Sequence, residues 1–358
     1  MALMATNQSN DTEESESVVS NNLSTGLGTF ILSLVFFIGV PGNLFIVWSI
    51  LFRTRKRSVT CLLILNLAFA DGGLMLLTPF FTVYLALRDW IFGEFMCKCL
   101  FYLCCMNMYA SIFFITLMSL DRLVAVAWPH QVPSIRRKRI VVKILIVLWV
   151  VTFVFAIPAV MFRHVTTTDN STRRLCSAHH PSRKDEVFQY SFETVFSFIV
   201  PFTIILSSYG YILYRLRTSK FQRRLRSENL ILAIIGAFGF FWLPYHVVNI
   251  IQVAAGLAPL PLQTKLDHIW KTCRVVTSAL AFLSSCANPI LYTFVGKDYI
   301  KTAGLNFMAK LFEGTAQDLT SKRFRIGNTL SRQPSKDPAY LESVDLNKDG
   351  DSSTTATG

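Results

Sequence analysis

Seven long apolar stretches, separated by short polar segments, dominate the pattern along this chain. They cover residues 27–52, 59–87, 96–127, 141–162, 187–214, 229–256 and 272–295. An α-helix rises about 1.5 Å per residue, so each stretch is long enough to cross the roughly 30 Å apolar core of a bilayer. The third is the clearest, because no charged residue lies between Cys99 and Leu120 and Asp121-Arg122 follows at once. The pattern predicts an all-α membrane protein, a bundle of seven transmembrane helices.

Composition supports a membrane protein. Hydrophobic residues make up 52% of the 358 residues and charged residues only 16%, against about 25% charged residues in a typical soluble domain. The net charge of +13 is spread over short clusters between apolar stretches and does not form one basic face, so nucleic-acid binding is disfavoured. The eight cysteines follow no metal-ligand spacing, and we expect no metal centre.

The basic clusters predict the orientation in the membrane. They lie at 53–57, 136–143 and 215–226, in the links after the first, third and fifth stretches, while the other links are mixed in charge. Cytoplasmic loops carry the excess of Lys and Arg. We therefore expect a plasma-membrane protein with its N-terminus outside and its C-terminus inside.

The segments outside the bundle (27–295) differ in character. Residues 1–26 contain no Lys or Arg and are expected to be an extracellular glycosylated tail without a cleaved signal peptide. Residues 296–313 set apolar residues among lysines, which favours an amphipathic helix on the membrane surface. Residues 314–358 are rich in Ser and Thr, and we expect a disordered cytoplasmic tail. The glycosylation sequons are at Asn7, Asn10, Asn22 and Asn170.

Short motifs in the apolar stretches carry a resemblance. They are Gly42-Asn43, Leu67-Ala68-Phe69-Ala70-Asp71, Asp121-Arg122-Leu123, Trp149, Phe238 with Trp242-Leu243-Pro244, and Asn288-Pro289-Ile290-Leu291-Tyr292. In this order, the motifs resemble the rhodopsin class of G-protein-coupled receptors over about residues 20–315. The resemblance implies a receptor that catalyses no covalent chemistry on its ligand.

A carboxylate at mid-membrane depth, such as Asp71, needs polar partners, and we expect Asn43, Ser111 and Asn288 to supply them. By the resemblance, Asp71, Ser111 and Asn288 hold an allosteric sodium ion in the inactive state. A hydrogen-bond network without an ion remains the alternative. No other cofactor is expected.

The resemblance also assigns a set of activation residues. Arg122 would rest against Asp121 and then turn towards Tyr209 and the G protein, with Trp242 as a packing switch. The full set is Asp121, Arg122, Tyr209, Phe238, Trp242, Pro244, Asn288, Pro289 and Tyr292. The resemblance further implies a disulfide between Cys97 and Cys176 that holds the 163–186 loop over the pocket, with two free thiols as the alternative.

The ligand class follows from the outer halves of the helices. Cys104 stands seven residues after Cys97, where amine receptors carry aspartate, which disfavours a biogenic amine. The deep part of the last stretch has no lysine for a retinal Schiff base. Arginines at 163 and 274 flank an apolar cleft and suit a carboxylate on a long apolar chain. Glu193 and Tyr109 would serve ligand hydroxyls or a structural ion pair.

Longer runs resemble the leukotriene B4 receptor subfamily without separating its two subtypes. The runs include 47–51, 56–60, 108–111, 242–249, 279–285 and 309–314. The resemblance implies a hydroxylated eicosanoid ligand and chemotactic signalling in inflammation through inhibitory G proteins, with receptor kinases and arrestin as further partners. The implied ligand residues are Phe101, Tyr109, Arg163, Glu193, His246, Asn249 and Arg274.

Three other interpretations are weaker. A chemoattractant peptide receptor would also use basic rim residues and an acidic tail. A transporter or channel would show repeated halves and charged relays across the bilayer, and neither is evident in the sequence. An intramembrane enzyme would need a paired catalytic constellation, and His246 has no obvious partner for one.

Overall fold

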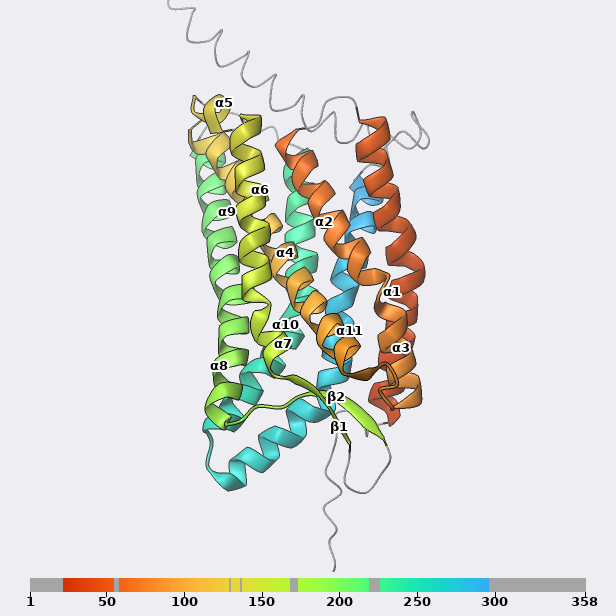
Figure 1. Ribbon diagram of the computed structural model, residues 1–358. Coiled ribbons are helices and arrows are strands. Elements are labelled where there is room, and N and C mark those ends of the chain that lie inside the picture. The colour runs from red at the N-terminus through yellow and green to blue at the C-terminus, as the bar shows by residue number, and fades with distance from the viewer. Residues whose placement is uncertain are drawn as a thin grey trace, which may run out of the picture. The chain divides into compact units, whose positions relative to one another are not determined.

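The computed structural model describes residues 22–54, 58–128, 130–135, 137–167, 173–218 and 226–295. Within them, seven helical spans are long and apolar enough to cross a membrane, as the hydropathy pattern predicts. Figure 1 shows these spans running side by side. The sequons at Asn7, Asn10 and Asn170 and the predicted segments 296–313 and 314–358 lie outside the described residues, whereas Asn22 is exposed at the start of the first helix.

Some of the seven spans consist of more than one helical element, and a short helix and one two-stranded hairpin lie between spans. In chain order, the elements are α1 (Asn22–Trp48), η1 (Ser49–Arg53), α2 (Val59–Met75), α3 (Thr78–Leu87), α4 (Gly93–Ala127), α5 (Val132–Ile135), α6 (Lys138–Phe155), α7 (Ile157–Met161), β1 (Arg163–Thr167), β2 (Arg174–Ala178), α8 (Arg183–Thr194), η2 (Val195–Ile199), α9 (Val200–Thr218), α10 (Arg226–Leu257) and α11 (Leu260–Val295).

Prolines account for the interruptions within the second, fourth and fifth spans. Proline has no backbone N–H and its ring clashes with the preceding turn, so it breaks or bends a helix. The second span changes from α2 to α3 just before Pro79, and the fourth changes from α6 to α7 just before Pro158. The π-helix η2 precedes Pro201. Pro244 and Pro289 lie inside α10 and α11 without ending either helix.

The last span departs most from the expected boundaries. The prediction starts it at residue 272, but α11 begins at Leu260, and only Ala258 and Pro259 separate it from α10. The turns of α11 before residue 272 are polar on one side, so their hydropathy is too low for the sequence to predict them as part of a membrane span. This extension brings Asp267 and Trp270 onto the same helix as Arg274, close to the start of α8.

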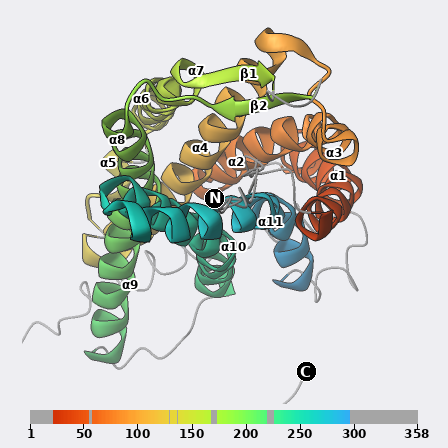
Figure 2. The same ribbon diagram turned by 90° about the horizontal axis from the view of Figure 1, so that it is seen from below.

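A two-stranded hairpin lies along one side of one end of the bundle, next to α4 and α7, and we call this end the hairpin end (Figure 2). Its strands pair antiparallel with Val165 opposite Cys176, and the predicted disulfide Cys97–Cys176 is confirmed, with a Cα–Cα distance of 5.7 Å. Arg174 donates to Asp89 from its backbone N–H and its guanidinium. These bonds lower the pKa of Asp89 from its ordinary value. The hairpin is thus tied to α4 and to the segment after α3.

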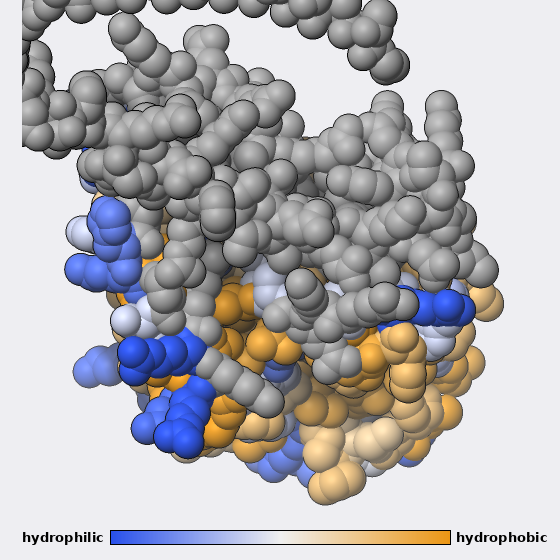
Figure 3. Space-filling view, turned by 90° about the horizontal axis from the view of Figure 1, so that it is seen from above, coloured by the Kyte–Doolittle hydropathy of each residue, from blue (hydrophilic) through white to orange (hydrophobic). Residues whose placement is uncertain are grey.

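The interior contains one apolar cluster at the centre of the bundle and one beneath the hairpin. Trp149 donates from Nε1 to Asn66 Oδ1 over 3.0 Å, which joins α6 to α2. Large apolar side chains also face outward, among them Phe37, Val147 and Phe240. Where the described residues are visible from the opposite end, apolar side chains cover much of the flank (Figure 3). A bilayer accounts for that exposed apolar surface.

Candidate functional site

Arg274 on α11 is the centre of a polar cluster at the hairpin end. Its guanidinium donates to Asn249 Oδ1 and to Gln252 Oε1, which lie one turn apart on α10. Three aromatic rings surround its Cζ atom, Tyr190 at 5.2 Å, Tyr245 at 5.3 Å and Trp270 at 5.6 Å from the ring centres. The side chain is therefore oriented by two amide oxygens and by cation–π contacts.

Both amides are held in turn by carboxylates of α8. Asn249 Nδ2 donates to Glu193 Oε1 over 3.0 Å, and Gln252 Nε2 donates to Glu186 Oε1 over 2.6 Å. Glu186 and Glu193 are seven residues apart, two helical turns, so they share one face of α8. Their side chains are buried. α8, α10 and α11 are thus connected through one network.

Arg274 keeps donors for a ligand. A guanidinium has five N–H groups, and two of them are used by the amide oxygens. Across the described ranges, Arg274 forms no ion pair with a carboxylate. A half-buried cation with three remaining N–H groups is suited to a carboxylate, which can accept two parallel hydrogen bonds.

A second predicted cation, Arg163, lies elsewhere at the same end. It is the first residue of β1 and lies just beyond the fourth span. Its Cζ atom lies 3.7 Å from the centre of the Phe101 ring, and its buried Nε atom has no hydrogen-bond partner in the part of the chain that the structure describes. The structure therefore brings Arg163 and Phe101 together, with the ring face on the cation.

Glu193 and Tyr109 line one small cleft between α4, α7 and α8, together with Cys105 and Phe192. Glu193 Oε1 accepts from Tyr245 as well as from Asn249, which leaves Oε2 as an acceptor. The structural ion pair expected as an alternative for Glu193 is absent among the described residues.

His246 lies beside the Arg274 cluster, with its ring centre 5.3 Å from that of Tyr245. It is buried against the rings of Phe198 and Trp242, and its Nε2 lies 3.4 Å from Ser197 Oγ. Its place is in the packing between η2 and α10. A ligand contact for His246 stays a prediction.

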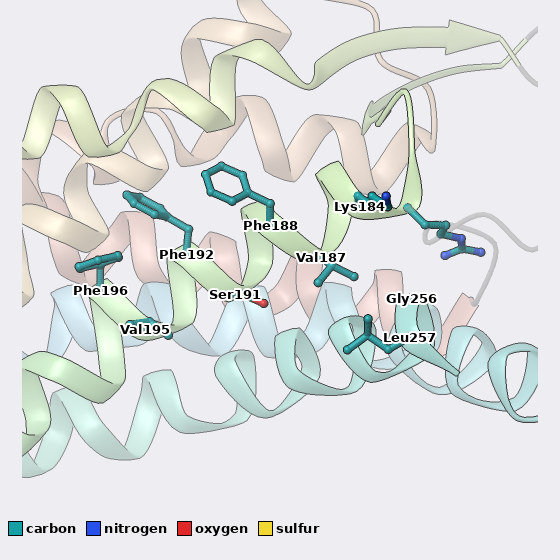
Figure 4. A pocket seen from close by; sticks show the side chains of 10 residues that line it. Lys184, Val187, Phe188, Ser191, Phe192, Val195, Phe196, Gly256 and Leu257 are labelled. Atoms are coloured by element: carbon teal, nitrogen blue, oxygen red, sulfur yellow. The ribbon is translucent and has the colours of Figure 1, made fainter. Parts of the chain in front are cut away.

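A larger groove lies between α8, η2 and the end of α10 (Figure 4). Val187, Phe192 and Leu257 line it, with Arg183 and Lys184 at one end. Phe188 and Leu257 are largely exposed, so this groove opens outward on the apolar flank. Arg274 and Glu193 do not line it, and we therefore place the candidate ligand site in the interior cluster.

Asp71 organises a second polar cluster at the centre of the bundle. Its Oδ1 accepts from Asn107, Ser111 and Ser285 over 3.1, 3.2 and 2.8 Å, and its Oδ2 accepts from Asn288 over 2.8 Å. Among the described residues, the buried Oδ1 atom of Asn107 has no hydrogen-bond partner. An orphaned oxygen beside a carboxylate and two hydroxyls fits a hard cation, which prefers oxygen ligands.

One expected partner of Asp71 is wrong. Asn43 does not reach the carboxylate and instead donates from Nδ2 to the backbone oxygens of Gly39 and Ser285. Its place is taken by Asn107 and Ser285. The backbone contact holds α1 against α11, where Gly42 allows Pro289 to approach closely.

The predicted activation residues lie on α4, α9, α10 and α11. Trp242 donates from Nε1 to Ser284 Oγ over 2.9 Å and stacks on Phe238 at 5.5 Å. Arg122 is buried and donates from Nη2 to Thr60 over 3.2 Å. Tyr209 is buried as well, and the side chain of Tyr292 is outside the described part. Asp121, Pro244 and Pro289 fall within α4, α10 and α11 as expected.

The sequence analysis missed five members of the Arg274 cluster: Glu186, Tyr190, Tyr245, Gln252 and Trp270. A periodicity signal was present for some of them. Gln252 follows Asn249 by three residues in an otherwise apolar stretch, and Glu186 precedes Glu193 by seven, so each shares a helix face with a predicted residue. Trp270 gave no such signal, because its segment was not expected to be helical.

Comparison with known proteins agrees with this arrangement. Residues 42–292 match the model of the family described as 7 transmembrane receptor (rhodopsin family). The chain is 40% identical to leukotriene B4 receptor 1 of Mus musculus, over 87% of this chain and 88% of the relative. It is 41% identical to leukotriene B4 receptor 1 of Homo sapiens over 88% and 89% of the two chains. For leukotriene B4 receptor 2 of Rattus norvegicus, the identity is 38% over 87% of each chain.

The family match over residues 42–292 includes the Asp71 cluster and the Arg274 cluster. Together with the seven apolar spans, this match makes the chain a multi-pass membrane protein. The chain belongs to the rhodopsin family of seven-transmembrane receptors.

Proposed function

We propose that this receptor is activated by a hydroxylated eicosanoid, with leukotriene B4 as the first ligand to test. The observation that carries the proposal is the Arg274 guanidinium, which is oriented by two amide oxygens, surrounded by aromatic rings and not paired with a carboxylate among the described residues. The relatives named as leukotriene B4 receptors support the same ligand class.

The ligand's parts match different groups of the site. Its carboxylate takes the remaining N–H groups of Arg274, and Glu193 Oε2 accepts from a hydroxyl on the chain. Arg163, fixed on the Phe101 ring, adds a second positive charge. The apolar chain packs on the aromatic rings around Tyr109 and Phe155, which contact edge to face at 5.6 Å.

Signalling follows from the position of Trp242. Tyr245, which contacts Arg274, is also in ring contact with Trp242 at 5.6 Å. A ligand that binds one arrangement of these rings more tightly shifts the equilibrium between inactive and active states by that difference in affinity. The hairpin end is then extracellular and the Arg122 end cytoplasmic, in agreement with the basic clusters. There, an inhibitory G protein binds the active state, and receptor kinases and arrestin act on the tail.

The Asp71 cluster holds a sodium ion in the inactive state. Asp71, Ser111 and the orphaned oxygen of Asn107 would hold it. When bound, the ion supplies a positive charge that offsets the buried carboxylate.

The test uses cells that express the receptor at the surface. Leukotriene B4 and 12-hydroxyheptadecatrienoic acid are applied, and cyclic AMP inhibition and calcium release are measured with and without pertussis toxin. A charged hydrogen-bond pair is worth about 1.5–3 kcal/mol, so Arg274→Ala should raise the half-maximal concentration roughly 10- to 150-fold. Lys265→Ala is the matched control, since it removes one positive charge from the exposed first turns of α11.

A saturable, toxin-sensitive response that Arg274→Ala weakens and Lys265→Ala leaves intact supports the proposal. Equal responses of Arg274→Ala and the unmodified receptor would refute the carboxylate anchor. Silence towards both lipids, with a response to a chemotactic peptide, would refute the ligand class and leave the family unchanged.

A further inference from the structure

Hydrogen bonds connect Arg274 through Gln252 to a second buried carboxylate, Glu186, and neither of these two residues has a role in the proposed function so far. Gln252 uses both ends of its amide. Its oxygen accepts from Arg274, and its nitrogen donates to Glu186 Oε1 over 2.6 Å. Both residues are buried, with 2% of Gln252 and 9% of Glu186 exposed.

The Glu186 carboxylate decides which way the Gln252 amide faces. A carboxylate accepts hydrogen bonds and donates none, so it selects the NH₂ end of the amide. The oxygen end is then turned towards the guanidinium. Without the carboxylate, the amide can rotate and present its own donors to Arg274, where two donor groups would face each other.

Glu186 is itself fixed and its charge compensated. Its Oε2 accepts from Arg183 Nη1 over 3.0 Å, and Arg183 also reaches Asp267 on α11 over 3.3 Å. Asp267 accepts from Trp270 Nε1 over 2.8 Å, and Trp270 is one of the rings around Arg274. The same ion-pair group thus anchors both the amide and an aromatic ring that hold the guanidinium.

We propose that Glu186 and Gln252 are positioning residues that aim the Arg274 guanidinium at the ligand carboxylate and thereby set the receptor's preference for a free acid over a neutral analogue. The Gln252 amide lies between the charges of Arg274 and Glu186 and orients the arginine through its neutral oxygen. Arg274 then keeps its charge and three N–H groups for the ligand, whereas a direct ion pair with Glu186 would occupy them. This inference rests on the proposed function, because it assumes a carboxylate ligand at Arg274.

The test compares leukotriene B4 with its methyl ester on the full receptor. The ester keeps the chain and the hydroxyls but carries no negative charge. Glu186→Gln replaces a group that only accepts hydrogen bonds by an amide that can accept or donate, so position 186 no longer selects the NH₂ end of Gln252. Gln252→Met removes the Gln252 amide, and both variants keep the side-chain volume. Each should weaken the free acid about five- to twenty-fold, as expected for a misdirected hydrogen bond, and leave the ester within about twofold.

The double variant distinguishes a connected route from two independent contacts. Because Glu186 acts through Gln252, adding Glu186→Gln to Gln252→Met should cost no further acid potency. Asp185→Asn is the matched control. It makes the same charge change one residue away, at a partly exposed carboxylate that accepts from Ser182 Oγ.

The outcomes separate the two proposals. If the unmodified receptor prefers the acid and Arg274→Ala abolishes that preference, the proposed function stands. The positioning role is then overturned if either single variant keeps the acid-to-ester ratio, if acid and ester weaken together, or if the two losses multiply. If the unmodified receptor does not distinguish acid from ester, the carboxylate anchor itself fails.

Discussion

Asp71 permits a sharp test of what the central polar cluster contributes to stability. It is fully buried and accepts four hydrogen bonds, from Asn107, Ser111, Ser285 and Asn288. A charged aspartate at the centre of a membrane helix costs about 2.5–3.5 kcal/mol on insertion scales. Replacing Asp71 tests whether the stability of the receptor depends more on the four hydrogen bonds that the carboxylate accepts or on the cost of its buried charge.

Asparagine and alanine at this position should differ. In Asp71→Asn the volume and one oxygen remain, the charge is lost, and Asn288 can turn its own oxygen towards the new NH₂. Without sodium, this variant should therefore be at least as stable as the unmodified receptor. In Asp71→Ala, the two serine hydroxyls can turn to carbonyls of their own helices, as Ser119 does towards Ile115.

The amides of Asn107 and Asn288 have no such substitute in Asp71→Ala. A buried donor left without a partner costs about 1–3 kcal/mol, although hydrogen bonds measured within membranes average about 0.6 kcal/mol. Two orphaned amides and the space left by the carboxylate place the alanine variant about 2–4 kcal/mol below the asparagine variant.

Thermal unfolding of the purified receptor in detergent, followed by tryptophan fluorescence in potassium buffer, measures this difference. At about 2–4 °C per kcal/mol, the alanine variant should unfold roughly 5–15 °C below the asparagine variant. Sodium should raise the midpoint of the unmodified receptor alone, because a ligand that binds only the folded state stabilises it. An asparagine variant that unfolds well below the unmodified receptor, or two variants within a degree of each other, would refute the reasoning.

Two further predictions concern packing and the hairpin. A Cβ atom at Gly42 would lie 2.8 Å from the rigid Pro289 ring, whereas one at Gly26 meets nothing within 4 Å. Gly42→Ala should therefore lower the free energy of unfolding by about 1–3 kcal/mol and reduce surface expression. Gly26→Ala should be neutral or stabilising. The pKa of Asp89 is lowered by its bonds to Arg174, so this contact should stabilise the hairpin fully above the ordinary aspartate pKa and be lost as pH falls through the lowered value. Hydrogen exchange of the Arg174 amide, corrected for its intrinsic rate, should show that loss in the unmodified receptor and no such pH dependence in Asp89→Ala; identical profiles would contradict it.

Most of the fold could be predicted from the sequence because it depends on local quantities. Apolar length alone defines a membrane span, and six of the seven expected spans agree closely with the structure. The Cys97–Cys176 pairing could also be inferred, since the resemblance identified both cysteines. The start of α11 at Leu260 could not, because hydropathy registers only residues that face lipid and not a helix that continues into water.

In the candidate site, too, the sequence identified individual residues but not the contacts between them. Arg274, Glu193 and Asn249 were identifiable as rare polar residues in apolar stretches. That Asn249 and Gln252 separate the arginine from two carboxylates depends on how α8, α10 and α11 face one another. Likewise, Asn43 rather than Asn107 was expected beside Asp71, since depth along a helix can be counted but rotation about its axis cannot. Spans and charges are properties of single segments, whereas hydrogen-bond partners are set by the packing between segments, and only the tertiary structure decides that packing.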